Sequence, residues 1–255
     1  FWGTKFINDQ CKAADYILAL GTRFAEADAS SWESEYTFNF QSTKLIHIDI
    51  DPNEIGRNYP VEIGAVADLK QALTVLNRVA KERLPEGLDR PQLKKDIAAY
   101  REEFQKSNLT NIQDESFPMK PQRILQEVRE VLPPDAFITT DVGWNKNGVG
   151  QQFPVYTPGT ILTPGGFATM GFGAPAALGA KIAQPDRVVV SLVGDGGFGQ
   201  NPSVLATAME ENIPVVWIVM NNSAFGTIAG LQMAHYETTY GTVFRKDGES
   251  YSPDF

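Results

Sequence analysis

The chain of 255 residues has few of the cysteines and histidines that form disulfides and zinc sites. It contains one cysteine, Cys11, and two histidines, His47 and His235. A single cysteine excludes an internal disulfide and is typical of a reducing compartment, so we expect the protein in the cytoplasm. One cysteine and two histidines far apart in the sequence also do not match the ligand spacing of a typical zinc site.

Basic residues are scarce as well. Lysine and arginine number 22 against 31 aspartates and glutamates, which gives a net charge of −9. This balance argues against nucleic acid and against an anionic membrane surface as partners. No apolar run approaches the length needed to cross a bilayer. The hydrophobic content of 42% is that of an ordinary globular protein.

The first part of the chain predicts an incomplete α/β domain. Apolar runs predict strands at 15–21 and 44–50, with a short third strand at 62–66, and Asp68 is expected to cap a helix that runs to about Lys81. Three strands with few helices leave one face of the sheet poorly covered, so we assign residues 1–82 to a partial Rossmann-like domain. Residues 83–118 are charged and polar, and predict a surface linker with one helical stretch near 92–104.

The second part, residues 119–255, predicts a parallel sheet with helices on both faces. The alternation of strands and helices carries this prediction, because parallel strands are joined by crossover helices. Residues 143–165 contain glycine, proline and asparagine throughout, and we expect them to be loops. The helix at 173–182 is built of alanine and glycine, so it should pack closely on its neighbours. Strands are expected at 136–140, 188–193 and 215–220, and further helices at 122–131 and 203–211.

Two polar side chains follow two neighbouring strands of this predicted sheet. Asp195 comes after the run 188–193 and Asn222 after the run 215–220, with one helix between them. The right-handed crossover of such a unit makes its strands parallel, so both side chains should lie at one edge of the sheet. A carboxylate and an amide oxygen suit a hard divalent cation whose other ligands are water and phosphate oxygens. The spacing therefore predicts a metal site that also holds a diphosphate.

An ordinary turn is the alternative for each of these residues taken alone. Asp-Gly after a strand is common in turns, and only the pairing of Asp195 with Asn222 favours the metal. Gly194, Gly196 and Gly197 are expected to let main-chain N–H groups approach phosphate, with a flexible turn as the alternative at any one of them.

These segments resemble those of a known family. Gly194-Asp195-Gly196, followed by Asn221-Asn222 at the next strand end, resembles the motif of thiamine-diphosphate-dependent enzymes. Residues 165–177 resemble the stretch that cradles the thiazole and pyrimidine rings in the acetolactate synthase branch, and 140–143 resemble its first cofactor-binding loop. The resemblance runs from about 122 to 228 and extends more weakly into residues 13–80.

The resemblance implies a set of ligands. Asp195 and Asn222 would bind magnesium through their side chains, and Ala224 through its backbone carbonyl. Met170 would support the folded V shape of thiamine diphosphate, with a gap-filling core methionine as the alternative. Acetolactate synthases usually carry Gln-His where this chain has Trp144-Asn145, and Asn145 is expected to donate to the diphosphate. The residues implied in cofactor binding are Gly143, Asn145, Met170, Gly194, Gly196, Gly197, Asn222 and Gly226.

The resemblance also implies an activity. We expect acetolactate synthase-like making or breaking of carbon–carbon bonds on a small-molecule 2-oxo acid. The family members are longer and have three α/β domains, so we interpret this chain as a fragment, the second half of a middle domain followed by a C-terminally incomplete diphosphate-binding domain. The activating glutamate of the relatives comes from a domain that this chain lacks. We therefore expect the chain alone to be inactive and the complete enzyme to be a homodimer or homotetramer.

Other interpretations stay open. A 2-oxo acid decarboxylase or a dione hydrolase of the same family fits the same motifs. Arg23 and residues 49–56 resemble segments that touch FAD in acetolactate synthases, so FAD is a further cofactor to consider, although a structural role is favoured there. From another class, Gly171-x-Gly173-x-x-Ala176 matches the fingerprint of an NAD- or FAD-binding domain, but that fingerprint requires a strand directly before it. A cofactor-binding fragment without catalysis is the last alternative.

Overall fold

The computed structural model describes residues 4–251, which form two compact units divided between Lys106 and Ser107. The helices are α1 (Lys5–Ala13), α2 (Leu69–Arg83), α3 (Pro91–Ile112), α4 (Pro121–Val131), α5 (Trp144–Gln152), α6 (Gly173–Ala183), α7 (Asp195–Phe198), α8 (Val204–Glu210) and α9 (Gly226–Tyr236), with short 3-10 helices at Glu26–Asp28 and Ser30–Trp32. The strands are β1 (Tyr16–Leu20), β2 (Lys44–Asp49), β3 (Ile63–Val66), β4 (Phe137–Thr140), β5 (Ile161–Leu162), β6 (Val189–Gly194), β7 (Val216–Met220), β8 (Arg245–Lys246) and β9 (Glu249–Ser250).

The N-terminal unit is a small parallel sheet in the order β1-β2-β3, close to the strands that the sequence predicts. Asp68 caps α2 as expected, because its carboxylate accepts a hydrogen bond from the Gln71 N–H at 3.1 Å. The helical stretch expected near 92–104 is longer than predicted and forms α3. Its first half packs on α1, where the rings of Phe6 and Tyr100 stack with their centres 4.2 Å apart.

One face of this sheet has an aromatic core, and the other is covered only in part. Ala19 and Leu45 pack against a group of aromatic rings, and the nearby His47 is buried with its Nε2 atom 2.8 Å from the Thr22 carbonyl oxygen. On the opposite face, Tyr16 and Leu18 remain 57% and 47% exposed. The sheet is therefore covered unevenly, as the sequence predicts. The aromatic rings of the core belong to Phe24, Phe38, Phe40 and Tyr59.

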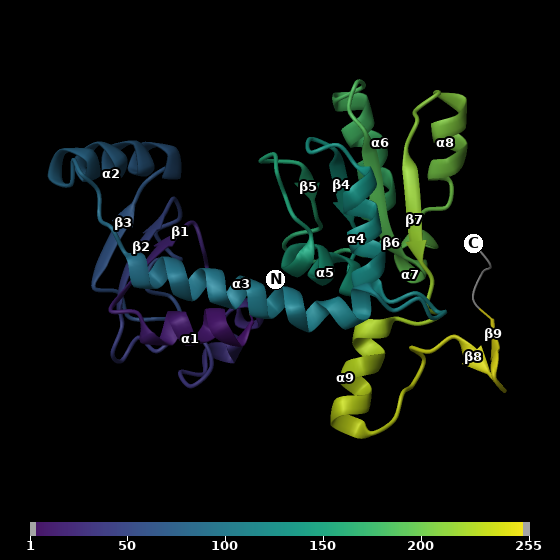
Figure 1. Cartoon of the computed structure of the whole chain (residues 1–255), viewed down its shortest axis with the longest axis horizontal. Coiled ribbons are helices and arrows are strands. Elements are labelled where there is room, and N and C mark those ends of the chain that lie inside the picture. The colour runs from purple at the N-terminus through teal and green to yellow at the C-terminus, as the bar shows by residue number, and fades with distance from the viewer. Residues whose placement is uncertain (1–3, 252–255) are drawn as a thin grey trace. The chain divides into compact units, whose positions relative to one another are not determined.

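The C-terminal unit contains the larger parallel sheet, in the order β5-β4-β6-β7. Alternate residues of β6 face opposite ways. Val190 and Leu192 pack with α4 and α5, whereas Val193 packs with α6 and α8. Figure 1 shows α4 and α8 flanking the strands of this sheet. The predicted fold class, a parallel sheet with helices on both faces, is confirmed.

The prediction of loops over residues 143–165 is wrong in its first part, which forms α5. The segment has poor intrinsic helix propensity, but Val149 and Phe153 are buried in the core beneath α4. Gly148 leaves room for the ring of Trp144, since a Cβ atom there would lie 2.5 Å from that ring. Packing in the folded unit therefore overrides local propensity. The turn expected after β6 likewise forms a short helix, α7.

Helix α6 packs on the sheet as closely as its composition predicts. A Cβ atom on Gly173 would lie 2.8 Å from Val193 Cγ1 and 2.9 Å from the backbone carbon of Thr140. Ala174 and Ala177 are fully buried. In the described part of the chain, no helix combines the length and the apolarity needed to cross a bilayer.

Candidate functional site

The structure places Asp195 and Asn222 at the same edge of the sheet. Strands β6 and β7 are adjacent and parallel, with Gly194 opposite Met220 in the register. Asp195 follows the end of β6 directly, and Asn222 lies two residues beyond the end of β7. Figure 1 shows α7 and the start of α9 at the end of the sheet toward which the arrowhead of β7 points. This is the edge at which open α/β sheets bind their ligands.

Asp195 has a carboxylate oxygen that lacks a partner. The residue is only 5% exposed, and its Oδ2 atom is buried without a hydrogen-bond donor. Burying a carboxylate oxygen in this way costs free energy unless a cation or a donor joins it. The described residues contain no group of three or more histidines, cysteines or acids that could hold a metal. A cation at Asp195 would therefore need amide, carbonyl, water or phosphate oxygens as its other ligands, which are the ligands that Mg²⁺ accepts.

Asn222 and Ala224 form one turn beside Asp195. The Asn222 Oδ1 atom accepts a hydrogen bond from the Ala224 N–H at 3.0 Å, which leaves its second lone pair for another partner. Ser223 between them has a φ of 54°, and Ala224 bridges to Val243 of the following segment. A Cβ atom on Gly226 would lie 2.8 Å from Asn222 Nδ2, so glycine leaves room for that side chain. The turn is thus held in place by its own hydrogen bonds.

Met170 reaches the glycine-rich turn from a distant part of the sequence. A Cβ atom on Gly196 would lie 3.2 Å from the Met170 methyl group and 2.6 Å from the ring of Phe225. Both apolar side chains therefore close over the backbone of Gly196. Gly197 is also restricted, because a Cβ atom there would lie 2.5 Å from Asp141 Oδ1. These contacts bring Met170 beside the turn that contains Asp195.

The first predicted loop, with Gly143 and Asn145, lies at the same edge. Gly143 precedes α5 with a φ of 103°, a conformation that favours glycine, and its Cβ position lies 3.4 Å from Thr227 Oγ1 at the start of α9. The Asn145 side chain is buried, and its nitrogen donates to the Val142 carbonyl at 3.2 Å. A Cβ atom on Gly194 would lie 3.6 Å from that nitrogen. The loops after β4, β6 and β7 therefore converge.

Sequence reasoning missed the role of Asp141, which holds these loops together. Its carboxylate is 1% exposed and accepts hydrogen bonds from the N–H groups of Val142 at 2.8 Å, Gly171 at 3.1 Å and Gly173 at 2.8 Å. The Asn201 side chain donates to the Gly171 carbonyl at 2.8 Å. The backbone next to Met170 is therefore fixed from both sides. An acid at a strand end, in a chain with a later Gly-x-Gly helix start, is the signal that could have indicated this contact.

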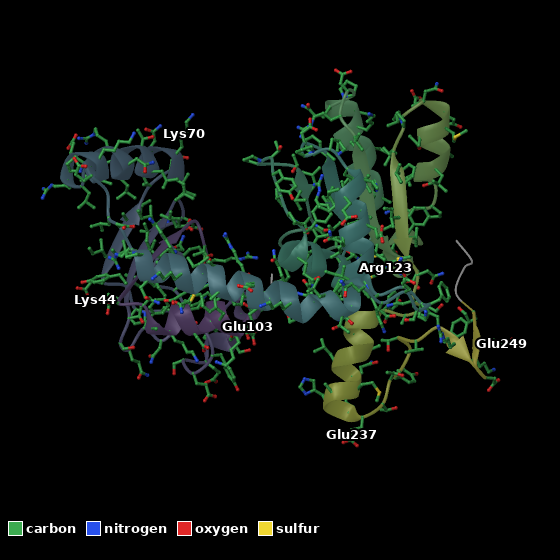
Figure 2. The ribbon with its side chains drawn as sticks, in the orientation of Figure 1. Lys44, Lys70, Glu103, Arg123, Glu237 and Glu249 are labelled. Atoms are coloured by element: carbon green, nitrogen blue, oxygen red, sulfur yellow. The ribbon has the colours of Figure 1, made fainter. Side chains whose placement is uncertain are left out.

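Two of the alternative sites find less support. Residues 163–172, between β5 and α6, contain no strand, so the dinucleotide fingerprint lacks the strand that it requires. In the segment compared with FAD-binding proteins, the Arg23 carbonyl accepts from Asn58 at 2.9 Å and Asp51 accepts from the Asn53 N–H at 2.9 Å, both structural contacts. Figure 2 shows Glu237 at the end of α9 that points away from the sheet, and we assign it no role.

An open parallel sheet with a buried, incompletely paired acid at its carboxyl edge defines an α/β protein that binds a ligand at its strand ends. Residues 141–255 match the family model described as "Thiamine pyrophosphate enzyme, C-terminal TPP binding domain", and residues 1–76 match "Thiamine pyrophosphate enzyme, central domain". The two models together match most of the chain, so the chain belongs to the thiamine pyrophosphate enzymes.

Three relatives illustrate the similarity. The chain is 36% identical to a "Probable acetolactate synthase large subunit" of Methanocaldococcus jannaschii, over 99% of this chain and 42% of that protein. It is 35% identical to a protein of the same description from Methanococcus aeolicus, over 92% and 40%. It is 33% identical to "Acetolactate synthase, chloroplastic" of Arabidopsis thaliana, over 96% and 36%. The chain thus spans about two fifths of the length of the archaeal relatives.

Proposed function

We propose that the chain is the cofactor-binding part of a thiamine diphosphate- and Mg²⁺-dependent enzyme that makes or breaks carbon–carbon bonds of 2-oxo acids. The observation that carries the proposal is the buried Oδ2 atom of Asp195, which has no partner at the edge where β6 and β7 end. The names of the relatives, acetolactate synthases, favour that activity over a decarboxylase or a dione hydrolase. Analysis of the products formed from pyruvate by the complete enzyme separates these three activities.

Each site residue has a proposed task. The Asp195 carboxylate, the Asn222 amide oxygen and the Ala224 carbonyl would hold Mg²⁺, which requires oxygen ligands. Asn222 can serve as a metal ligand because only one lone pair of its Oδ1 atom is used by the hydrogen bond within the turn, and the second lone pair is left for the metal. The N–H groups of the glycine turn after β6, and that of Gly143, would donate to the diphosphate. Gly226 leaves room for the Asn222 side chain.

Met170 has a positioning task. Thiamine diphosphate, when bound, supplies a carbon nucleophile that adds to the keto carbon of a 2-oxo acid and accepts the electron pair left by decarboxylation. Met170 and Phe225 both lie against Gly196 on one side of the turn. Asp141 and Asn201 fix the backbone next to Met170, so the position of its backbone is set before the cofactor binds.

Finer features belong to the same proposal. We propose a homodimer or homotetramer for the complete enzyme, FAD as a further cofactor to test, and a reducing compartment such as the cytoplasm. The single cysteine supports the last of these. The resemblance of residues 49–56 supports a test of FAD, although the local hydrogen bonds of Asp51 and Asn53 favour a structural role.

Calorimetric titration of the 255-residue chain tests the proposal. Thiamine diphosphate should bind in the presence of Mg²⁺ and not in the presence of EDTA, and Asp195→Ala should weaken binding by about 100-fold or more. Asp186→Ala, an exposed acid of the same unit, is the matched control and should bind as the wild type does. Equal affinity in Asp195→Ala would overturn the proposal. Binding of NAD without metal would support the dinucleotide interpretation instead.

A further inference from the structure

A second buried oxygen without a partner lies in the same region, on the side chain of Asn145. The residue is 5% exposed, and its Oδ1 atom is buried without a hydrogen-bond donor. The orientation of the amide follows from its neighbour. The Val142 carbonyl can only accept, so the nitrogen faces it at 3.2 Å and the oxygen points elsewhere. Asn145 therefore presents an acceptor that the described residues leave unsatisfied.

The Asn145 side chain lies against the backbone that leads into Asp195. A Cβ atom on Gly194, the residue directly before Asp195, would lie 3.6 Å from Asn145 Nδ2. The edge of the sheet thus holds two buried acceptor atoms, Asp195 Oδ2 and Asn145 Oδ1, with no donor for either. Unpaired buried acceptors are costly, and each of these two atoms indicates a ligand that brings positive charge or donors.

The chemistry of the expected ligands decides which of them can bind to the Asn145 oxygen. A diphosphate presents only acceptor oxygens, so it offers nothing to the Asn145 oxygen. A magnesium ion keeps several water ligands, and their polarised O–H groups are strong donors. This inference rests on the proposed function. We propose that Asn145 Oδ1 accepts a hydrogen bond from a water molecule bound to the cation at Asp195, a role that differs from the diphosphate donor expected from the sequence.

The test separates affinity for the cation from affinity for the cofactor in the 255-residue chain. Mn²⁺ replaces Mg²⁺, and electron paramagnetic resonance of free Mn²⁺ reports its binding at saturating thiamine diphosphate. Asn145→Ala should weaken Mn²⁺ binding by about 10-fold, the usual cost of losing a partner that supports a metal ligand. Asn145→Asp, which keeps an acceptor, should bind Mn²⁺ at least as tightly as the wild type. Thiamine diphosphate affinity at saturating metal should change by less than about threefold in both variants.

The matched control is Asn147→Ala, since residues two apart on α5 face different sides of the helix. It should leave both affinities unchanged, and thermal unfolding without ligand checks that each variant is folded. Unchanged Mn²⁺ affinity in Asn145→Ala overturns the inference, as does equal weakening in Asn145→Asp. Weaker thiamine diphosphate binding with unchanged Mn²⁺ affinity assigns Asn145 to the diphosphate instead. A wild-type chain that binds neither ligand overturns the proposed function itself, a result distinct from these.

Discussion

At the scale of single residues, two buried aspartates at one sheet edge have opposite surroundings. Asp141 accepts hydrogen bonds from three backbone N–H groups, so its charge is satisfied within the protein. Asp195 is also buried, with 5% of its surface exposed against 1% for Asp141, yet its Oδ2 atom has no donor. The first carboxylate therefore stabilises the folded chain, whereas the second is the one that we propose as a cation ligand. The two should respond differently to the same substitution.

Asp141→Ala should lower the free energy of unfolding by about 3 kcal/mol or more, because three N–H groups lose their acceptor and each such loss costs about 1–3 kcal/mol. Asp141→Asn, which keeps one oxygen, should cost less. Urea denaturation measures both, and Asp186→Ala on the exposed surface should stay within about 0.5 kcal/mol of the wild type. A loss in Asp141→Ala no larger than in the control would contradict the role assigned to this carboxylate.

Asp195→Ala should not destabilise the protein when no cofactor is present. Removing a buried and unpaired carboxylate should leave the free energy of unfolding unchanged or raise it by about 1 kcal/mol. The same variant should lose the stabilisation that thiamine diphosphate and Mg²⁺ give the wild type. A loss of more than about 2 kcal/mol without ligand would show that the carboxylate is structural.

At the scale of elements, the packing of α6 on the sheet sets the position of the site. The helix begins at Gly173, whose N–H donates to Asp141 and whose carbonyl accepts from Thr139 at 2.8 Å and from Ser191 at 3.0 Å. The start of the helix is therefore tied to β4 and to β6. A displacement of α6 would move Met170 three residues before it.

Gly173→Ala should destabilise the protein by about 1–3 kcal/mol, since the added methyl group meets backbone atoms of β4 that cannot move aside. Gly179→Ala on the same helix is the matched control. Its added Cβ atom meets nothing within 4 Å, so it should stabilise the helix by about 0.4–1 kcal/mol. Thermal unfolding of both variants measures the difference. Equal effects in the two variants would contradict the packing described.

The sequence predicted the elements that its hydrophobic pattern determines. The apolar runs before Asp195 and Asn222 gave the two strands, and the crossover rule placed both residues at one edge. Helix α5 could not be predicted in the same way, because its glycines and asparagines favour a loop and only the burial of Val149 and Phe153 stabilises it. The contact between Asp141 and Gly173 depends on the tertiary structure, as do the unpaired oxygens. The roles of the site residues stay predictions.

At the scale of the whole molecule, the residues of the candidate site all lie in the C-terminal unit, between Asp141 and Gly226. The N-terminal unit has its own aromatic core. It also contains the half-buried Cys11 on α1, whose chemical reactivity can report whether this unit is folded. Burial raises the pKa of the Cys11 thiol. The folded state therefore favours the neutral thiol. The free energy of unfolding should fall as the pH rises above the pKa that the Cys11 thiol has in the unfolded chain.

Alkylation of Cys11 checks this expectation. Thiolate is the reactive form, so iodoacetamide at about pH 8 should react more slowly with the folded chain than with the chain in urea. The effect of urea on the reaction itself is measured with a small-molecule thiol and subtracted. The difference between the two rates should shrink under conditions that destabilise the N-terminal unit, because Cys11 is then exposed more often. Equal rates in the folded and unfolded chain would show that Cys11 is not protected.

The central claim is that an acid and an amide from neighbouring strand ends hold one cation that anchors a diphosphate. A crystal structure of the chain with Mn²⁺ and thiamine diphosphate, with anomalous data at the manganese edge, tests it most directly. The account predicts one anomalous peak within about 2.3 Å of both an Asp195 carboxylate oxygen and the Asn222 side-chain oxygen, with the Ala224 carbonyl, diphosphate oxygens and a water molecule completing the shell. A peak elsewhere, or a diphosphate bound away from these two residues, would contradict it.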